Sequence, residues 1–258
     1  MSQGEPLLRV SDVSVRFGGV RALDGVSCHV NAGEICGLIG PNGAGKTTLF
    51  NCVTRLYPLA SGAITLAAER IDTLPARAIV SRGIARTFQN VGIYPDMSVE
   101  ENVALGAHHS HGGRFFETLA RPRASDAKER ALRAECGAIL ATLELDRVAH
   151  QRAGNLPYGT LKRVEIARAL ATRPRLLLLD EPAAGLNHQE RIAFGDLIRR
   201  IRDAFALTVL LVEHQMGLVM GLCGRLLVLH LGQLLAEGTP REISANPAVV
   251  SAYLGEAA

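Results

Sequence analysis

The chain is organised around the stretch Gly40-Pro41-Asn42-Gly43-Ala44-Gly45-Lys46-Thr47-Thr48. It follows the apolar run 35–39 and precedes residues 49–53, which predicts a strand, a glycine-rich turn and a helix. The spacing fits G-x-x-x-x-G-K-[ST], the phosphate-binding loop. Glycines let backbone N–H groups curl toward a phosphate chain, and the start of the helix adds its positive dipole end. We expect Lys46 to contact the β- and γ-phosphates and the Thr47 hydroxyl to coordinate Mg²⁺.

The bulk composition limits the class of protein. The chain has 258 residues, of which 48% are hydrophobic, enough for one α/β domain with a subdomain and an ample core. Its net charge of +3 is compatible with contact with anionic lipid head groups but too small to indicate binding to DNA or RNA. We therefore expect no nucleic-acid partner.

Cysteine usage and the N-terminus predict a cytosolic protein. The five cysteines are scattered and form no C-x-x-C pair, so we expect reduced core residues rather than disulfides or a zinc site. Residues 1–6 show no sign of a signal peptide, and no apolar run approaches the roughly 20 residues that span a bilayer. The sequence thus predicts a protein that does not cross a membrane by itself.

The segment before the phosphate-binding loop is predicted to be antiparallel β-structure. Apolar residues alternate partly over 7–17, a second strand is expected over 21–30, and Gly18-Gly19 between them favours a turn. Phe17 lies at the end of the first strand. Its position alone leaves two interpretations open, a core aromatic residue or a platform stacked on an adenine ring.

The remaining segments are predicted from apolar periodicity and turn residues. Strands are expected at 63–66, 83–88, 175–180, 208–212, 225–230 and 233–236. Helices are expected at 75–82 with Pro75 as the first residue, from 99 onward, at 126–145, 161–171 and 191–203, and after Pro240 and Pro247. Residues 108–123 are interpreted as a loop, in which the histidines at 108, 109 and 111 lack zinc-like spacing and favour a solvated segment.

Polar residues follow several of these strands, where parallel sheets bind ligands. Asp180 and Thr47 can hold Mg²⁺, directly or through water, and Glu181 is the candidate base that aligns and polarises a water molecule. His214 could hydrogen-bond the γ-phosphate. Gln89 could reach both metal and water and link the site to the helical segment. Either residue alone would indicate only a loop, but together and in this order they predict ATP hydrolysis.

The order of these motifs resembles that of the nucleotide-binding subunit of an ABC transporter. The matching motifs are Walker A at 40–48, the Q-loop at Gln89, the signature Leu156-Pro157-Tyr158-Gly159-Thr160, Walker B at 176–180 with catalytic Glu181, the D-loop Ala183-Ala184-Gly185-Leu186-Asn187 and the switch histidine His214. Phe17 falls at the family's adenine-stacking position, which favours that interpretation of its role. The resemblance covers nearly the full chain and implies ATP and Mg²⁺ as cofactors.

The resemblance also implies the architecture. The expected fold is α/β, a P-loop NTPase (RecA-like) core with an antiparallel β-subdomain and an inserted helical subdomain. Residues 1–258 would form a single nucleotide-binding domain. Within it, 1–89 and 173–258 would make the ATP-binding core with the β-subdomain, and 90–172 the helical subdomain.

Three stretches resemble the importer ATPases of the branched-chain (hydrophobic) amino acid uptake group. They are residues 16–23, residues 83–90, and residues 236–240 with the ending 252–255. The resemblance implies a second ABC ATPase subunit, identical or different, and two membrane permease subunits fed by a periplasmic or extracellular binding protein. The chain would then lie peripherally on the cytoplasmic face of the inner (plasma) membrane. Substrate choice would reside in the partners.

Alternative functions stay open at this point. One is the ATPase of another ABC system, such as lipopolysaccharide export or urea and amide uptake. Another is a soluble ATP-driven clamp on DNA or ribosomes, although the second nucleotide domain or long coiled coil usual in that class is missing. A third is a non-catalytic nucleotide-binding regulator, against which Glu181 and His214 argue.

Two departures from the family pattern matter. The usual signature is L-S-G-G-Q, often L-S-Y-G-Q in this group, whereas this chain has Pro157 and Thr160 in place of serine and glutamine. In the family the signature covers ATP held by the partner's phosphate loop, so Pro157 removes a hydroxyl donor while the Gly159 N–H remains. We hypothesise that the site covered by this signature is weakened. The other departure is Asn187, where many members have aspartate.

Overall fold

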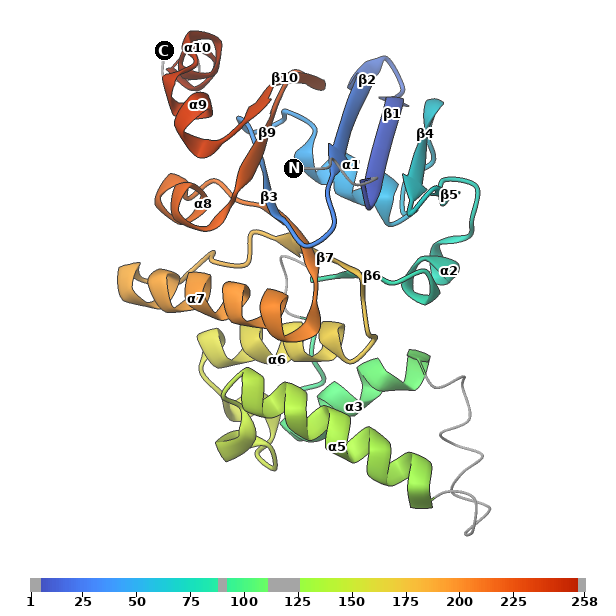
Figure 1. Ribbon diagram of the computed structural model, residues 1–258, viewed down its shortest axis with the longest axis vertical. Coiled ribbons are helices and arrows are strands. Elements are labelled where there is room, and N and C mark those ends of the chain that lie inside the picture. The colour runs from blue at the N-terminus through green and yellow to red at the C-terminus, as the bar shows by residue number, and fades with distance from the viewer. Residues whose placement is uncertain (1–5, 88–91, 111–125, 255–258) are drawn as a thin grey trace.

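The computed structural model describes residues 6–87, 92–110 and 126–254 (Figure 1). At its centre is a six-stranded sheet with the order β10 (Gln233–Gly238), β9 (Arg225–His230), β3 (Ile35–Ile39), β8 (Thr208–Val212), β7 (Leu176–Asp180) and β6 (Ile84–Arg86). Neighbours from β9 to β6 are parallel, and β10 pairs with β9 in antiparallel fashion. The predicted α/β fold is confirmed, with the phosphate-binding stretch directly after β3.

The central sheet is buried on both faces. The four leucines of β7, Leu176 to Leu179, are fully buried, as the unbroken apolar run predicts. Leu176 and Leu178 belong to a core shared with the second sheet, whereas Leu177 and Leu179 belong to a core shared with the helices. Successive side chains of a strand point to opposite faces, so each strand residue joins the core on its own side.

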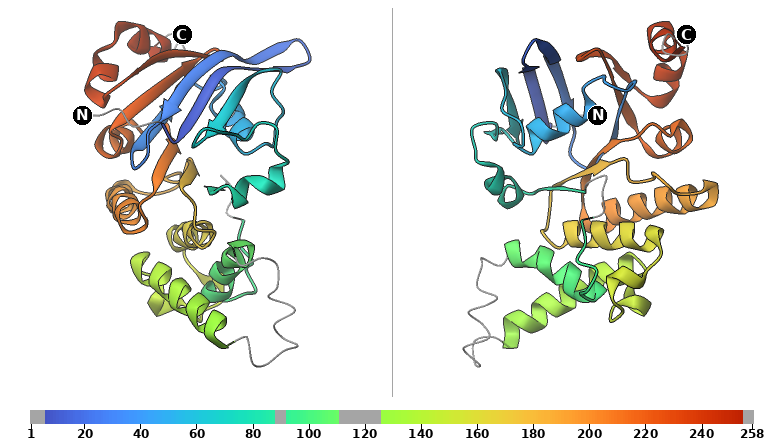
Figure 2. Two further views of the ribbon diagram at one scale, coloured as in Figure 1. Left: turned by 45° about the vertical axis from the view of Figure 1, so that its right-hand side comes forward. Right: turned by 180° about the vertical axis from the view of Figure 1, so that it is seen from behind.

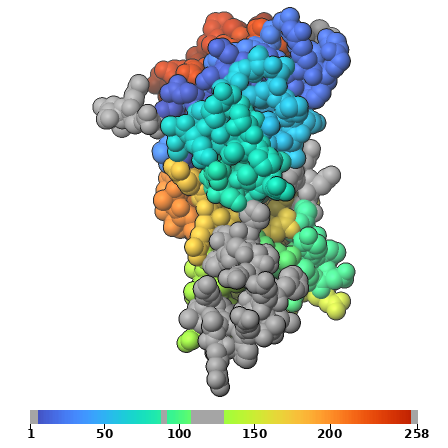
Figure 3. All heavy atoms as spheres, turned by 90° about the vertical axis from the view of Figure 1, so that its right-hand side faces the viewer, coloured from blue at the N-terminus to red at the C-terminus, as the bar shows by residue number. Residues whose placement is uncertain are grey.

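The second sheet is the predicted antiparallel one. Its order is β2 (Val20–Val30), β1 (Leu8–Phe17), β4 (Ser61–Leu66) and β5 (Glu69–Arg70). Gly18 turns between β1 and β2 with a φ of 57°, a conformation that favours glycine. Helix α1 (Lys46–Val53) buries Leu49 and Phe50 in the core shared by both sheets. Strands β4 and β5 and helix α2 (Ala76–Ser81) form one face of this part of the molecule (Figure 3).

Helices cover the other face of the central sheet and extend away from it. Helices α3 (Val99–Ser110), α5 (Asp126–Thr142) and α6 (Tyr158–Leu170) follow β6 in the chain, with short 3₁₀ turns at Asp146–Val148 and Ala153–Asn155. After β7 come α7 (His188–Phe205), α8 (Met216–Leu222), α9 (Pro240–Ala245) and α10 (Pro247–Leu254). Helix α5 and the small sheet lie at opposite ends of the molecule (Figure 2). The proposed limits of the helical subdomain, 90 and 172, remain a prediction.

Several predicted boundaries are wrong, for local reasons. Helix α3 continues to Ser110, so residues 108–110 are helical rather than part of a loop, and 111–123 lie outside the described residues. Helix α5 ends at Thr142, and Glu144 follows with a φ of 58°, which does not fit a helix. Pro75 is the N-cap of α2 instead of its first residue. Strand β5 and helix α8 are too short to give a clear apolar period.

The expectations about cysteines and membrane spans can be checked directly. All five cysteines are buried and free. Burial raises the pKa of the Cys28 and Cys223 thiols to about 12, so both stay protonated near neutral pH. Within the described ranges, no helix has the length and apolar character needed to span a bilayer.

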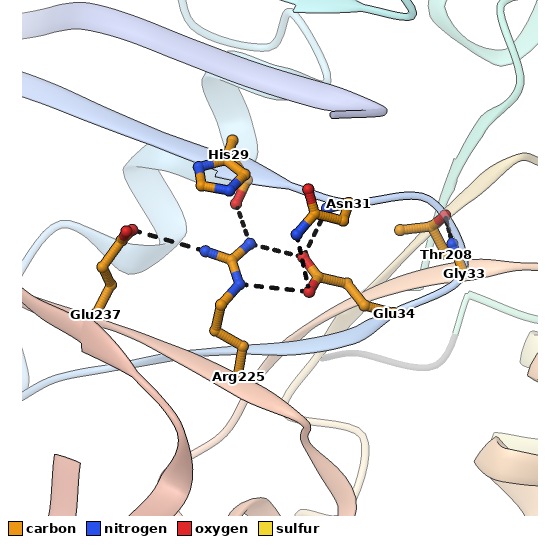
Figure 4. A network of polar contacts seen from close by, with 7 residues as sticks. All are labelled: His29, Asn31, Gly33, Glu34, Thr208, Arg225 and Glu237. Carbon is orange, nitrogen blue, oxygen red and sulfur yellow. Dashed lines mark hydrogen bonds and ion pairs between the residues drawn. The ribbon is translucent and has the colours of Figure 1, made fainter. Parts of the chain in front are cut away.

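Arg225 joins the two sheets. From β9, its guanidinium donates to the backbone carbonyl of His29 in β2 at 2.6 Å and to Glu34, just before β3, at 2.6 Å, and it lies 3.6 Å from Glu237 in β10 (Figure 4). The Glu34 carboxylate also accepts from the backbone N–H of Asn31 at 2.6 Å. The side chains of Arg225 and Glu34 are 17% and 18% exposed, so solvent screens the pair weakly.

We expect Arg225→Met to lower the free energy of unfolding by about 2–4 kcal/mol, because it removes the charged donor from both Glu34 and the His29 carbonyl. Urea unfolding would measure the loss. Arg82→Met is the matched control, since the Arg82–Glu69 pair is 39% and 50% exposed and should cost at most about 1 kcal/mol. Equal losses in the two variants would contradict a special role for Arg225.

Candidate functional site

The phosphate-binding stretch follows a path that requires glycine at two positions. Gly40 and Gly45 have φ values of 150° and 102°. A Cβ atom would lie 2.1 Å from the Leu229 carbonyl oxygen at Gly40 and 2.7 Å from the Ala22 carbonyl oxygen at Gly45. Any side chain at either position would therefore push the loop off β9 or β2. Close packing of backbone on backbone holds the loop in this conformation.

Lys46 is the first residue of α1 and is 8% exposed. Its ammonium group donates to the backbone carbonyls of Gly40 at 2.7 Å and Pro41 at 2.8 Å. Gly45, the N-cap of α1, offers no side-chain acceptor to the first turn of the helix. The loop thus combines a buried cation with helix N–H donors, which suits a polyphosphate. Of the other loop residues, Pro41 and Ala44 are buried, Thr48 is half-buried, and Asn42, Gly43 and Thr47 are exposed.

Strand register brings the predicted catalytic residues to the same edge as this loop. Leu38 in β3 and Asp180 in β7 both align with Val212 in β8. Parallel pairing therefore places the ends of these three strands side by side, and the residues that follow them meet at one edge of the sheet. The loop after β3, Glu181 after β7 and His214 after β8 are brought together as the sequence predicts.

Glu181 and His214 face each other at this edge. The Nδ1 atom of His214 lies 3.8 Å from Oε1 of Glu181, and their side chains are 52% and 26% exposed. Glu181 has a φ of 46°, and its backbone N–H donates to the Val212 carbonyl at 2.9 Å. A non-glycine residue in the left-handed region costs free energy and is found disproportionately at functional sites. The turn after β7 is held in this conformation by its bond to β8.

Arg86 is a residue at the site to which the sequence alone assigns no role. It ends β6, and its Nη2 atom lies 2.7 Å from Oδ2 of Asp180, with both side chains less than a tenth exposed. Its Nη1 donates to Asn51 at 2.6 Å and to Thr54 at 3.3 Å, and the guanidinium lies 5.5 Å from the Phe50 ring centre. Arg86 therefore ties the aspartate of Walker B to the helix of Walker A. The sequence places Arg86 inside the predicted strand 83–88, next to no recognisable partner, so it gave no signal of this role.

Glu213 is a second residue that sequence reasoning left without a role. It lies between β8 and His214 and is 1% exposed. Burial raises the pKa of its carboxyl group, while hydrogen bonds from backbone N–H groups act in the opposite direction. An acid next to a predicted catalytic histidine was visible in the sequence, but its burial and its partners were not.

The signature residues begin α6 and contact the D-loop of the same chain. Pro157 is the N-cap of α6, so the helix starts at Tyr158, three residues earlier than the predicted 161. A Cβ atom on Gly185 would lie 3.4 Å from the Tyr158 ring, and one on Gly159 would lie 3.7 Å from Leu186. Tyr158 is 46% exposed, and Leu156 and Thr160 are half-buried.

The D-loop leads into α7. Ala183 and Leu186 are buried, and Ala184 is half-buried. Asn187 accepts from the Glu190 N–H at 3.0 Å, and the Glu190 carboxylate accepts from the Asn187 N–H at 2.8 Å. This capping box starts α7 at His188, before the predicted 191, and explains why asparagine serves at this position.

The remaining predicted site residues are Phe17 and Gln89. Phe17 is 46% exposed and meets Tyr57 edge-on with ring centres 5.0 Å apart. It is therefore not a core aromatic residue, and it lies at the end of the hairpin whose β2 strand packs on the phosphate-binding loop at Gly45. Gln89 lies outside the described residues. The backbone N–H of Thr87 bonds to Leu178, so the chain runs beside β7 as far as that residue.

The donor set at this edge fits a magnesium ion held mainly by a nucleotide. Thr47 offers an exposed hydroxyl and Asp180 a carboxylate, the hard oxygen donors that Mg²⁺ takes. Pairing with Arg86 uses one Asp180 oxygen, and a carboxylate has further acceptor positions. Among the described residues, no group of three or more His, Cys, Asp or Glu side chains could hold a metal alone. Mg²⁺ commonly keeps several waters and binds through substrate phosphates.

This loop and this sheet edge, with a helical segment between β6 and β7, define a P-loop ATPase. Residues 23–184 match the family model described as ABC transporter, and residues 233–258 match that of the branched-chain amino acid ATP-binding cassette transporter. The chain belongs to the ABC transporter family and is one of its ATPases. The resemblance expected from the sequence is confirmed.

Individual relatives match over nearly the full length. BraF of Pseudomonas aeruginosa, a high-affinity branched-chain amino acid transport ATP-binding protein, is 43% identical over 252 residues, covering 98% of this chain and 99% of BraF. LivG of Salmonella typhimurium, which carries the same description, is 44% identical over 254 residues, with the same coverage. The crystal structure of the ADP conformation of MJ1267, an ATP-binding cassette of an ABC transporter, superposes with a TM-score of 0.83 at 30% identity, covering 98% of this chain and all of MJ1267.

Arg86 gives a testable prediction. Arg86→Lys keeps a charge but cannot contact Asp180, Asn51 and Thr54 at once, so we expect a loss of about tenfold in ATP turnover, equivalent to about 1.4 kcal/mol. The magnesium concentration for half-maximal turnover should also rise, because Asp180 is no longer oriented. Arg82→Lys, in an exposed ion pair, is the control. Turnover and magnesium dependence unchanged in Arg86→Lys would show that the pair with Asp180 is not needed.

Proposed function

We propose that this chain is the ATPase subunit of an importer of branched-chain amino acids. The observation that carries the proposal is the match of 43–44% identity, over nearly the whole of each chain, to ATP-binding proteins of branched-chain amino acid transport. The separate match of residues 233–258 to a family model of that transport group supports it. The partner proteins would select the substrate, and this chain would supply the energy.

Nucleotide binding is assigned to the phosphate-binding stretch and Phe17. The loop N–H groups and Lys46 would hold the phosphates, and the exposed ring of Phe17 would stack on adenine. Mg²⁺, when bound, would neutralise charge on the phosphates, with Thr47, Asp180 and Gln89 as its protein ligands or the ligands of its water. The buried ion pair with Arg86 supports this assignment, because it fixes the orientation of the Asp180 carboxylate through one of its oxygens.

Hydrolysis is assigned to Glu181 and His214. Glu181 would accept a hydrogen bond from the attacking water and polarise it, and His214 would hydrogen-bond the γ-phosphate. The 3.8 Å separation of the two side chains supports their action on one group of reacting atoms. Gln89 would report the state of this site to the helical part of the chain.

Dimerisation with a second ABC ATPase subunit would complete each site. The signature residues of one subunit, at the start of α6, would cover the nucleotide on the other, and the D-loop would run between them. The position of the signature on a helix N-terminus supports contact with a phosphate, because helix N–H groups favour anions.

A groove between α2, α3 and α6 is the proposed docking site for the permease subunits. Its lining includes Arg86 and Glu165 together with the exposed Tyr94 and Leu105. A permease segment bound there would contact helices α3 and α6 and, through Arg86, the end of β6 next to Asp180. The chain would thereby sit at the cytoplasmic face of the inner membrane without crossing it, supplied indirectly by an external binding protein.

Uptake in cells tests the substrate. We expect deletion of the gene to abolish uptake of labelled leucine, isoleucine and valine, and the intact gene to restore it. A gene carrying Glu181→Gln should fail to restore it. Loss of urea or amide uptake with unchanged leucine uptake would instead support the alternative import function, and unchanged uptake of all would contradict an importer of these substrates.

The reconstituted transporter tests hydrolysis. We expect Glu181→Gln to lower ATP turnover by roughly 10²-fold or more, the range for loss of a general base, while ATP binding is retained. Phosphate release and nucleotide binding would be measured on the same preparation. Glu69→Gln, an exposed surface change, should leave both unchanged. Full turnover in Glu181→Gln would rule out the proposed role of this acid.

The altered signature gives a further prediction. We expect Pro157→Ser to raise ATP turnover of the assembled complex by about tenfold or more, because a hydrogen bond to a charged group contributes about 1.5–3 kcal/mol. Pro157 has φ −57° and ψ 149°, an N-cap conformation that serine adopts readily. Pro157→Ala lacks the hydroxyl and should stay at the original rate. An equal rise in both variants would assign the effect to the backbone instead.

A further inference from the structure

Glu213 connects two loops that both belong to the catalytic edge. Its Oε1 accepts from the backbone N–H of Ala183 at 2.8 Å. Its Oε2 accepts from the backbone N–H of His214 at 3.3 Å and of Gln215 at 3.4 Å. The side chain is 1% exposed, so water does not compete for these donors.

The partners of the Glu213 carboxylate belong to three different parts of the catalytic edge. Ala183 is the first residue of the D-loop and lies two residues after Glu181. Gln215 is the N-cap of α8, and its carbonyl accepts from the backbone N–H groups of Leu218 and Val219. One side chain therefore holds the D-loop, the switch histidine and the start of α8 at fixed relative positions.

The contact also continues the sheet beyond its last strand pair. Asp180 aligns with Val212, and the Glu181 N–H bonds to the Val212 carbonyl at 2.9 Å. Beyond this pair the segments that follow β7 and β8 form no further strand pairing. The Glu213 side chain connects them instead, through its bond to Ala183. Glu181 is thus held by its own N–H bond to Val212 and by the bond that Ala183, two residues later, makes to Glu213.

Burying a carboxylate is costly unless hydrogen bonds compensate it. Both oxygens of Glu213 accept from backbone donors of loops that carry a predicted catalytic group. The arrangement suits a group that fixes geometry rather than one that reacts.

We propose that Glu213 is a positioning residue for ATP hydrolysis, which holds Glu181 and His214 in register and couples the D-loop to the switch histidine. The inference rests on the roles of Glu181 and His214 given under the proposed function. It predicts an effect on the chemical step and little effect on nucleotide binding, because the phosphate-binding loop is held separately by β9 and β2.

Two substitutions test the proposal in the assembled transporter. Glu213→Gln keeps an acceptor for one loop but turns an N–H₂ donor toward the other, whereas Glu213→Leu removes both acceptors at similar volume. We expect kcat to fall at least fivefold in Glu213→Gln and further in Glu213→Leu, with the dissociation constant for ATP changed less than twofold. If Glu213→Leu does not fold, Glu213→Gln alone decides.

A double-mutant cycle with His214→Ala separates positioning from general structural damage. Because Glu213 acts partly through His214, Glu213→Gln should reduce kcat less in the His214→Ala background than in the wild type. Glu34→Gln is the matched control, since Glu34 is also a largely buried carboxylate that accepts a backbone N–H but lies before β3, at the end remote from the loop. It should lower thermal stability and leave kcat within twofold.

Three outcomes would overturn the proposal. They are an unchanged kcat in folded Glu213 variants, a parallel fall in ATP affinity and kcat, and a fully additive cycle with His214→Ala. An unchanged kcat in His214→Ala by itself would instead refute the proposed role of the histidine, so failure of the two ideas can be told apart.

Discussion

The register of three parallel strands is the constraint on which the rest of the site depends. Val212 in β8 aligns with Leu38 on one side and Asp180 on the other. A shift of one residue in either pairing would turn every side chain to the opposite face, exchange the two cores and move Asp180 away from the phosphate-binding loop. The leucines of β7 oppose such a shift because alternate leucines are buried in different cores, one on each face of the sheet. Packing of apolar residues thus determines where the charged ones meet.

The site itself is not optimised for stability. Glu181 has a left-handed backbone, Arg86 and Asp180 are buried charges, and Glu213 is a buried acid whose pKa is raised by burial. Each of these features costs free energy unless neighbouring groups compensate it. The compensation comes from backbone donors and from ion pairing, and the apolar cores on both sides of the sheet supply the remaining stability. Backbone strain and buried charge are expected at functional sites, so these features agree with the assignment of this edge to catalysis.

The sequence allowed the elements of the site to be located but not all of its connections. The loop at 40–48, the buried strands and the acids after β7 could be predicted because each depends on local spacing or apolar runs. Arg86 and Glu213 could not be interpreted, since their partners lie in elements distant along the chain. The start of α6 was also missed. Proline suggests a break, but at Pro157 its φ of −57° suits the residue that caps a helix.

The contacts of the signature bear on how its altered sequence acts. Tyr158 lies against Gly185 with Lys162 5.5 Å from its ring centre, and Gly159 lies beside Leu186. The D-loop is in turn fixed at its start by Glu213 and at its end by the Asn187 cap. These contacts of the first turn of α6 are made by Tyr158, Gly159 and Lys162. Proline at this position lacks the hydroxyl donor of the usual serine while the Gly159 N–H remains, so we expect the difference from the usual signature to be chemical rather than positional.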